Sequence, residues 1–467
     1  MDATTQALVE FWRRAEPARL TPNAVLACKR RLIDTIGCAL LAYDAPLCQM
    51  ARRMALRHTG NPAATIWGTT AQVAPEAAAF ANGVMLRFSD MSDMYRGKSG
   101  GHPSDVMAAI LAVAETVEAD GPAVINAMAL AYDVYCSFCD AIDINSLGWD
   151  QPVYSILASV LGAGKLLRLT DVQMENAIAL ALAPNMALYQ TRQGELSNWK
   201  GCAGANASRN AVFAAYLAQE GFTGPTSVFE GKGGLWDAVG RFAWPLPDDN
   251  AKQRWIERTH FKCFPICYHG QTAVWAALDA RPQLGDQEIA KIELETYKSA
   301  VQIMASDRSR WSPDNHETAD HSLPFVIISA LLDGEVTDAS FVPARLSDGR
   351  IKDLMQKVEV RESADCTART PEAAPCRMTI TTKAGAQIKT EVLYPKGHAM
   401  NTLSDAEIDL KFSQMSRNFG APEQGAALLA ELRRLDEVKD IRQLLAGIAR
   451  AASSADRKAE RKINAAH

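Results

Sequence analysis

Apolar positions follow a helical period through the first half of the chain. In five segments, small and apolar residues recur three or four positions apart, which places them on one face of an α-helix. These segments are residues 23–41, 75–86, 106–118, 153–167 and 171–183. Gly-Pro pairs at 121–122 and 224–225 interrupt the pattern, as is typical of breaks between helices. We therefore expect an all-helical region that extends to about residue 245.

The pattern changes beyond residue 245. Apolar and polar residues alternate with a period of two in 291–297 and 357–361, which predicts short strands. Segments 378–382 and 387–394 flank Lys383-Ala384-Gly385-Ala386, so we expect a β-hairpin there. Helical spacing resumes after Pro395-Lys396-Gly397-His398 and continues to about residue 450.

These patterns predict a mainly α protein with a smaller α+β domain. We expect residues 1–250 to form the first part of a large helical domain and residues 251–397 to form the small domain. Residues 398–450 are expected to return to the large domain, and 451–467 to form a disordered tail. A length of 467 residues agrees with more than one domain, because it exceeds what a single core usually organises.

Composition and charge exclude several classes of partner. The net charge is −5 and the basic residues are scattered, so we expect no nucleic-acid surface and no attraction to membranes. We find no apolar run of about eighteen residues or more, the length of a spanning helix. Asp2 and Glu10 surround Phe11-Trp12-Arg13-Arg14, a pattern without the apolar core of a signal peptide, so we expect a cytoplasmic protein.

The cysteines do not form a recognisable ligand set. Ten of them in a chain of this length agree with buried thiols in a reducing compartment. The one C-x-x-C, formed by Cys136 and Cys139, lies in helical pattern, and Cys263 with Cys267 has no second pair at a zinc spacing. We therefore predict no metal site.

The segment Gly100-Gly101-His102-Pro103-Ser104-Asp105 has the composition of an active-site turn that leads into an apolar helix. Glycines allow unusual backbone conformations, and Pro103 suits a first helical turn. We expect His102 to lie beside free backbone N–H groups that can face an anion. Asp90 or Asp93, just upstream, could hold the imidazole tautomer and raise its basicity, although both could equally cap a helix.

Two further segments carry candidate chemistry. In the first, small residues follow Lys200 up to Arg209, which suits either ligand approach with Lys200 as a charge donor or plain helix packing. The second lies across the expected domain junction and includes Lys262, His269 and His321. A lone histidine is more often structural than catalytic, so spacing alone leaves both readings of His269 and His321 open.

Four of these segments together resemble the MmgE/PrpD family. The resemblance rests on residues 101–105, 199–209, 261–273 and 317–324, and shorter stretches at 331–337 and 394–398 agree with it. It implies a homodimer with a large helical domain, a smaller α+β domain, a site between them, and no metal or organic cofactor. It also implies that His102 and Lys200 are the central catalytic pair, that Asp90 is an acidic site position, and that His269 and His321 share the pocket.

The chain departs from the family pattern at three places. Met94 stands where a threonine that contacts substrate is common, Asp150-Gln151 where a histidine is frequent, and Phe325 where many members have tyrosine. Polar contacts discriminate strongly between substrates, so these positions are candidates for substrate binding. Lys262, Arg209 and Arg192 are weaker candidates for holding an acid.

The resemblance implies a cofactor-independent lyase that removes water from a 2-hydroxy tricarboxylate such as 2-methylcitrate. His102 would be the base or the proton donor, and Lys200 would pair with a carboxylate or help protonate the departing hydroxide. The same residues would serve an epimerase of iminodisuccinate or a decarboxylase of cis-aconitate, and the sequence does not separate these reactions. A noncatalytic binding module of the same fold is the alternative from another class.

Overall fold

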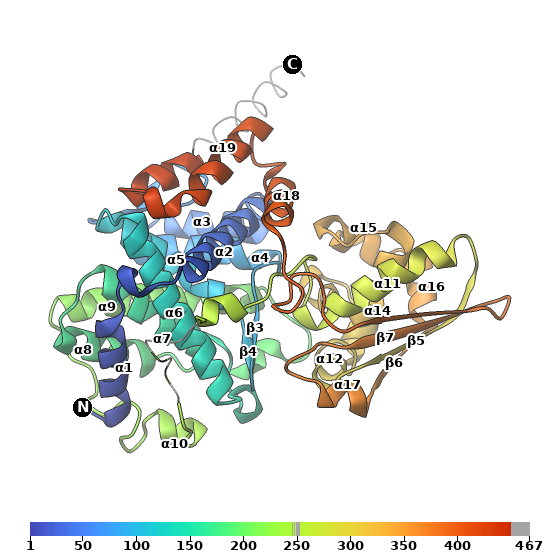
Figure 1. The fold of residues 1–467 in the computed structure, drawn as a ribbon, viewed down its shortest axis with the longest axis horizontal. Helices are drawn as coiled ribbons and strands as arrows, with labels where there is room; N and C mark the ends of the chain where they lie inside the picture. Colours follow the sequence, from blue (N-terminus) through green and yellow to red (C-terminus); the bar gives the residue numbers. More distant parts are fainter. Residues whose placement is uncertain (245, 247, 249–252, 450–467) are drawn as a thin grey trace.

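The protein has two lobes, each with its own hydrophobic core (Figure 1). The computed structural model describes residues 1–244, 246, 248 and 253–449. The larger core combines residues from 8–261 with residues from 403–448, and the smaller one lies within 264–392. The predicted fold class, mainly α with a smaller α+β part, is confirmed. The predicted tail at 451–467 lies outside the described residues.

Helices build the large lobe, and the five predicted segments all form helices whose ends lie within two residues of the expected ones. The helices are α1 (Ala3–Arg14), α2 (Pro22–Leu41), α3 (Pro46–Ala55), α4 (Pro75–Phe88), α5 (Val106–Thr116), α6 (Gly121–Ala141), α7 (Pro152–Leu166), α8 (Asp171–Leu182), α9 (Trp199–Gln219), α10 (Leu235–Val239), α18 (Asp405–Ser416) and α19 (Pro422–Arg433).

The prediction that the first 245 residues are all-helical is wrong in one respect. Two short antiparallel ladders interrupt the helices. They pair β1 (Ala64–Thr65) with β2 (Gln72–Val73), and β3 (Tyr95–Arg96) with β4 (Gly100–Gly101). Strands of two residues carry too few positions to produce a period-two pattern, so the sequence gives no signal for them.

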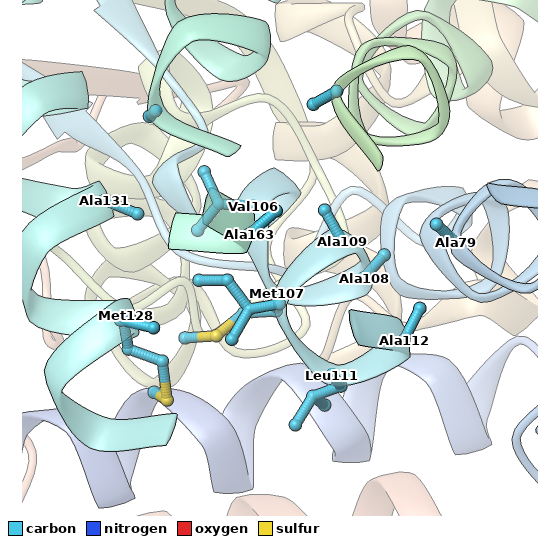
Figure 2. Packing of buried hydrophobic residues seen from close by; sticks show 14 of the residues in the cluster. Ala79, Val106, Met107, Ala108, Ala109, Leu111, Ala112, Met128, Ala131 and Ala163 are labelled. Atoms are coloured by element: carbon cyan, nitrogen blue, oxygen red, sulfur yellow. The ribbon is translucent and has the colours of Figure 1, made fainter. Parts of the chain in front are cut away.

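Helix α5 lies at the centre of the large lobe, and ten of its eleven residues are buried. Its side chains are mostly Ala, Val and Leu, so neighbouring helices approach closely from several sides. Figure 2 shows Val106, Met107 and Ala108 of α5 together with Ala79 of α4 and Ala163 of α7. This packing fixes the start of α5, which follows His102 after a single short turn.

Helix α6 is long and apolar enough to cross a membrane by length and composition. The prediction that no run reaches this length is therefore wrong for α6. Its mean hydropathy over an eighteen-residue window is 1.2, and 89% of that window is buried inside the protein. The apolar character of α6 is accounted for by its packing against α5 and α7.

The C-terminal part of the chain returns to the large lobe. Helix α18 packs against α2, and α19 contacts both of them. Backbone hydrogen bonds also join the C-terminal part to the start of α6: the N–H of Gly121 donates to Val438 at 2.8 Å, and the N–H of Ile441 donates to Ala119 at 2.9 Å. A side chain at Gly121 would collide with the carbonyl oxygen of Leu435, so glycine is required for this approach.

A four-stranded sheet with the order β6-β5-β7-β8 forms the small lobe. Strands β5 and β6 are parallel, whereas β7 is antiparallel to β5 and forms the predicted hairpin with β8. The strands are β5 (Ile289–Thr296), β6 (Val358–Glu362), β7 (Cys376–Thr382) and β8 (Gln387–Val392). The α-helices are α11 (Gln271–Leu284), α12 (Lys298–Met304), α13 (His316–Ala319), α14 (Leu323–Asp333), α15 (Pro343–Leu346), α16 (Gly349–Met355) and α17 (Ala364–Ala368).

Alternation of buried and exposed residues sets the orientation of this sheet. In β7, every second residue from Cys376 to Thr382 is buried, and Ile292 of β5 lies opposite Ile380 of β7. Helix α11 covers β7 and β8 and packs against α14 (Figure 1). The loops between these elements carry the small-lobe residues of the candidate site.

Candidate active site

A pocket of about 580 Å³ is lined by residues of both lobes. Seven lysine or arginine residues line it, against four aspartates. The cations are Arg87, Arg96, Lys98, Arg192, Lys200, Lys262 and Arg310. Three histidines also line it: His102, His269 and His321. An excess of positive charge in a recessed site favours an anionic ligand.

A short hairpin holds His102 at one wall of the pocket. Strand β3 pairs with β4, and His102 follows β4 directly. A side chain at Gly101 would collide with the hydroxyl of Tyr135, so only glycine fits. Neither Gly100 nor Gly101 has a positive φ, so the expectation that they supply unusual backbone conformations is wrong. At Gly101, close packing is the reason for glycine.

Hydrogen bonds fix the tautomer of His102. Its Nδ1 lies 2.8 Å from the backbone oxygen of Asp93, and its backbone N–H donates to Oε1 of Gln151 at 2.8 Å. A carbonyl only accepts, so Nδ1 carries the hydrogen and Nε2 of the neutral ring has a free lone pair. Burial, with the charges of Arg87 and Lys262, lowers the pKa of His102 well below its ordinary value. His102 is therefore a neutral imidazole that can accept a proton.

The helix start beside His102 does not offer an anion site. The N–H of Ser104 donates to Oδ1 of Asp93 at 2.9 Å, and the N–H of Asp105 donates to the oxygen of His102 at 3.1 Å. The second bond belongs to a single 3-10 turn, Pro103–Asp105, which precedes α5. The prediction of free N–H groups that face an anion is therefore wrong, because the Asp93 side chain and this turn already bind them.

Three buried cations share the carboxylate of Asp90. Lys262 Nζ lies 2.8 Å from Oδ1, Arg87 Nη1 lies 3.3 Å from Oδ1, and Lys200 Nζ lies 3.4 Å from Oδ2. Burial favours a raised pKa for Asp90, but the charges of Lys200, Lys262 and Arg87 outweigh it and hold the pKa well below its ordinary value. Asp90 is therefore ionised, and it keeps several cations together at the base of the pocket.

Lys200 lies near the N-terminus of α9 among three carboxylates. Its Nζ is 2.7 Å from Asp320 Oδ2, 3.2 Å from Glu317 Oε2 and 3.4 Å from Asp90 Oδ2. Burial works against the charged form, but Asp320, Asp90 and Glu317 raise the pKa of Lys200. Lys200 is therefore a fixed positive charge.

Two groups of acidic and imidazole side chains have ligand atoms within 4.8 Å of one another, a spacing that could hold a metal ion. One is Asp90, Asp320 and His321, and the other is His316, Glu317 and Asp320. The ammonium group of Lys200 contacts a carboxylate from each group. These carboxylates thus already have a cation supplied by the chain itself.

His321 and Cys267 form a second titratable pair on the small-lobe wall. His321 Nδ1 is hydrogen-bonded to Asp320 Oδ1. Burial and the charge of Lys200 disfavour the protonated ring, but Cys267 and Asp320 outweigh them and raise the pKa of His321. Burial works to raise the pKa of the Cys267 thiol, yet the charge and hydrogen bond of His321 lower it. Both shifts move the pair in the direction of an imidazolium beside a thiolate.

Most of the residues predicted from the sequence are brought together here. The pocket is lined by His102, Lys200, Asp90, Met94, Asp150, Gln151, Lys262, His269 and His321. Gln151 positions His102 through the backbone bond described above, and Asp150 pairs with Arg192 at 3.1 Å. His269 Nδ1 lies 2.8 Å from the hydroxyl of Tyr297.

Two predicted residues do not reach the pocket. Arg209 is exposed and contacts Asn206 on the outer face of α9. It lies nine residues after Lys200, which is two and a half helical turns and therefore the opposite face. Phe325 is buried in the small-lobe core, where its ring packs against Phe341 with centroids 5.9 Å apart. The prediction that Arg209 and Phe325 bind substrate is therefore corrected, because neither residue lines the pocket.

Sequence reasoning missed other residues of the pocket. Arg87, Arg310 and Cys267 all line it, and none was singled out as a site residue. Arg87 lies in the last turn of α4 and Arg310 in a 3-10 turn, η7 (Arg308–Trp311). An arginine near a helix end is usually a surface residue, so no local pattern separates these two from exposed ones.

Comparison with known proteins agrees with this architecture. Models of the MmgE/PrpD N-terminal domain and the MmgE/PrpD C-terminal domain match residues 6–243 and 264–437. The chain belongs to the MmgE/PrpD family.

Curated proteins of known name are similar over most of this chain. A 2-methylcitrate dehydratase of Escherichia coli is 28% identical over 398 residues, which cover 79% of this chain and 80% of that protein. A 2-methylcitrate dehydratase of Cupriavidus necator is 28% identical over 434 residues, 86% of this chain and 88% of that protein. The human cis-aconitate decarboxylase is 24% identical over 443 residues, 90% of this chain and 89% of that protein.

The pairing of Cys267 with His321 predicts a reactive thiol. At neutral pH, iodoacetamide is expected to alkylate Cys267 faster than Cys263, because the thiolate is the nucleophile. Burial raises the pKa of Cys263 to about 11, whereas His321 lowers that of Cys267. Peptide mass spectrometry over a time course measures both rates in one sample.

Exposure alone predicts the opposite order. Cys263 is half-buried and Cys267 is buried, so a reaction governed by access would modify Cys263 first. A His321→Gln variant is the matched control, and it should slow the alkylation of Cys267 while leaving that of Cys263 unchanged. Faster labelling of Cys263 in the unmodified protein would contradict the assignment.

Proposed function

We propose that this protein is a lyase that removes water from a 2-hydroxy polycarboxylic acid, with 2-methylcitrate as the first candidate substrate. The observation that carries the proposal is a pair of imidazoles, His102 and His321, whose pKa values are shifted in opposite directions in one cation-rich pocket. Such a pair supplies a base and an acid to the same reaction. The relatives named 2-methylcitrate dehydratase support this choice of reaction.

Proton removal is the difficult step, because hydrogen α to a carboxylate is weakly acidic. In the proposed mechanism, Nε2 of His102 accepts this proton, since its Nδ1 is already committed to Asp93. Negative charge then develops on the substrate carboxylate. The ammonium groups of Lys200 and Lys262 stabilise that charge without moving, because their contacts with Asp90 hold them in place.

The departing hydroxide requires a proton donor. His321 is proposed for this role, since its pKa is raised and, with Nδ1 bound to Asp320, its Nε2–H is the donor. In the free protein this hydrogen is shared with Cys267, and in the reaction the departing hydroxide would replace Cys267 as its acceptor. Hydroxide takes that proton and leaves as water, and the electron pair of the former C–H bond forms the double bond. Lys200, whose pKa is raised further, is the poorer acid and serves as a charge.

The proposal includes independence from metal and organic cofactors. It is supported by Lys200, whose ammonium group contacts Glu317 and Asp320. These carboxylates could otherwise serve as ligands of a divalent ion, and Lys200 supplies the positive charge in its place. The homodimer and the cytoplasmic location remain predictions from the sequence.

A substrate panel tests the proposed function. Chelator-treated protein is incubated with 2-methylcitrate, citrate, cis-aconitate and iminodisuccinate, while alkene absorbance, carbon dioxide release and product chirality are followed. Formation of alkene from 2-methylcitrate is the expected result. Carbon dioxide release from cis-aconitate would establish the decarboxylase alternative. If no acid of the panel is converted, the lyase proposal is refuted. Loss of activity on chelation, with recovery on adding a divalent ion, would overturn cofactor independence.

The opposite shifts of the two imidazoles predict a bell-shaped pH profile for kcat/KM. His102 must be neutral, so activity should rise as pH passes its pKa, below the ordinary imidazole value of about 6.5. His321 must be protonated, so activity should fall as pH passes its pKa, above that value. In a His321→Gln variant the alkaline limb should disappear while the acid limb stays. A profile that only rises between about pH 5 and 9 would contradict these roles.

A further inference from the structure

Arg310 is a buried cation whose charge has no carboxylate partner within the part of the chain that the structure describes. It belongs to η7 in the small lobe and is 3% exposed. Its Nε donates to the carbonyl oxygen of Ile303 at 3.3 Å, and its Nη1 is buried without a hydrogen-bond partner. No carboxylate of a described residue lies within ion-pair distance of its guanidinium, and Asp307 and Asp320 act on its charge only from further away. Arg310 nevertheless lines the same pocket as His102 and Lys200.

A guanidinium in this position lowers the stability of the protein when no ligand is bound. A buried donor left unsatisfied loses its hydration without compensation, and the penalty is greater for a charged group. Arginine cannot escape by losing its proton, because its pKa is too high. Buried arginines are therefore normally paired, and an unpaired one beside a pocket indicates that a ligand supplies the missing partner.

A second free donor belongs to the opposite lobe. Arg192 donates from Nε to Asp150 at 3.1 Å and from Nη1 to the backbone oxygen of Lys200 at 3.2 Å, yet its Nη2 is buried without a partner. Arg192 forms an ion pair with Asp150, whereas Arg310 forms none, and burial outweighs the more distant charges of Asp307 and Asp320 and lowers its pKa. Each lobe thus has one pocket-lining arginine with a buried guanidinium nitrogen that lacks a hydrogen-bond partner, and only Arg310 also lacks an ion pair.

We propose that Arg310 binds a carboxylate of the substrate and determines how many carboxylates the enzyme requires. A carboxylate accepts two parallel hydrogen bonds from one guanidinium, so Nη1 of Arg310 would gain a charged acceptor. The inference rests on the proposed function, since it names a contact of the same polycarboxylate. With Arg310 in the small lobe and His102 in the large one, bound substrate bridges the two lobes.

Direct binding tests the inference without relying on turnover. Citrate and malate, a 2-hydroxy acid with one carboxylate fewer, are titrated calorimetrically into the full-length protein and its variants. Arg310→Met is expected to weaken citrate binding by about 10- to 100-fold, the effect of losing a charge-assisted hydrogen-bonded pair. It should weaken malate binding less, and Arg310→Lys should recover part of the citrate affinity. The matched control is Arg308→Met, an exposed arginine of the same turn, which should bind citrate as the unmodified protein does.

Thermal stability separates a binding role from a structural one. Arg310→Met removes a buried charge that has no partner, so its unfolding temperature without ligand should equal or exceed that of the unmodified protein. A lower unfolding temperature with unchanged citrate affinity would overturn the inference. Unmodified protein that binds no carboxylate would overturn it as well. Binding that depends on Arg310 without turnover of any acid would instead refute the proposed function alone.

Discussion

Replacing His102 with glutamine is expected to lower kcat by about a thousandfold, within the range that a positioned general base contributes. Glutamine fills most of the space of the imidazole ring, but no basic nitrogen remains. KM should change little, because the cations that bind the acid are untouched. The measurement is steady-state turnover of whichever acid of the panel the unmodified protein converts best.

Chemical rescue makes this test specific to proton transfer. In His102→Ala the side chain is removed, and added imidazole should restore part of kcat by entering the space. In His102→Gln the space is filled, so imidazole should have no effect. His58→Gln, at an exposed position, is the control and should keep full activity. A kcat for His102→Gln within tenfold of the unmodified protein would refute the base assignment.

Periodicity predicted the fold well, because burial imposes it along the chain. The segments with a clear apolar spacing in the sequence form helices α2, α4, α5, α7 and α8 and strands β5 to β8. The wrong predictions concerned strands too short to show a repeat, such as β3 and β4. They also included the statement that no segment is long and apolar enough to span a membrane, because α6 meets that criterion. These failures are local, so they did not disturb the assignment of the fold class.

Predicting the site required more than periodicity. Lys200 and Asp320 are 120 residues apart, and Asp90 and Lys262 are 172 apart, yet each pair is in direct contact. Only the resemblance to a family predicts, from the sequence, that these segments contribute to one site. The exclusion of Arg209 could have been derived from helical geometry, because a residue nine positions from Lys200 lies on the opposite face.

Arg310 and Cys267 could not be selected from the sequence for a physical reason. Whether an arginine is paired, or a thiol ionised, depends on neighbours that the chain brings together only on folding. The partner that lowers the pKa of Cys267 is His321, 54 positions further along. Their chemistry therefore becomes visible only in three dimensions, where the whole surroundings of each side chain can be inspected.

Asp90→Asn is expected to lower the free energy of unfolding by about 3 kcal/mol, the cost of removing one partner from a buried ion pair. The change leaves the shape of the side chain intact but takes a negative charge from Lys200, Lys262 and Arg87. Lys262 limits the loss, because burial already lowers its pKa and it can release its proton. Urea unfolding followed by far-UV circular dichroism measures the difference. Glu359→Gln, which breaks an exposed pair with Lys291, should change stability by less than about 1 kcal/mol.

The pH dependence of this loss separates charge from shape. The pKa of Asp90 in the folded protein lies well below its ordinary value of 3.8, so its carboxylate stabilises the fold fully above that value. The stabilisation is lost as pH falls through the lowered pKa, because a protonated aspartate resembles asparagine. The gap between Asp90→Asn and the unmodified protein should therefore be constant near neutral pH and narrow in strong acid. A gap that stays the same at every pH would mean that the amide fails for steric reasons, and that Asp90 does not hold the cations of this site by its charge.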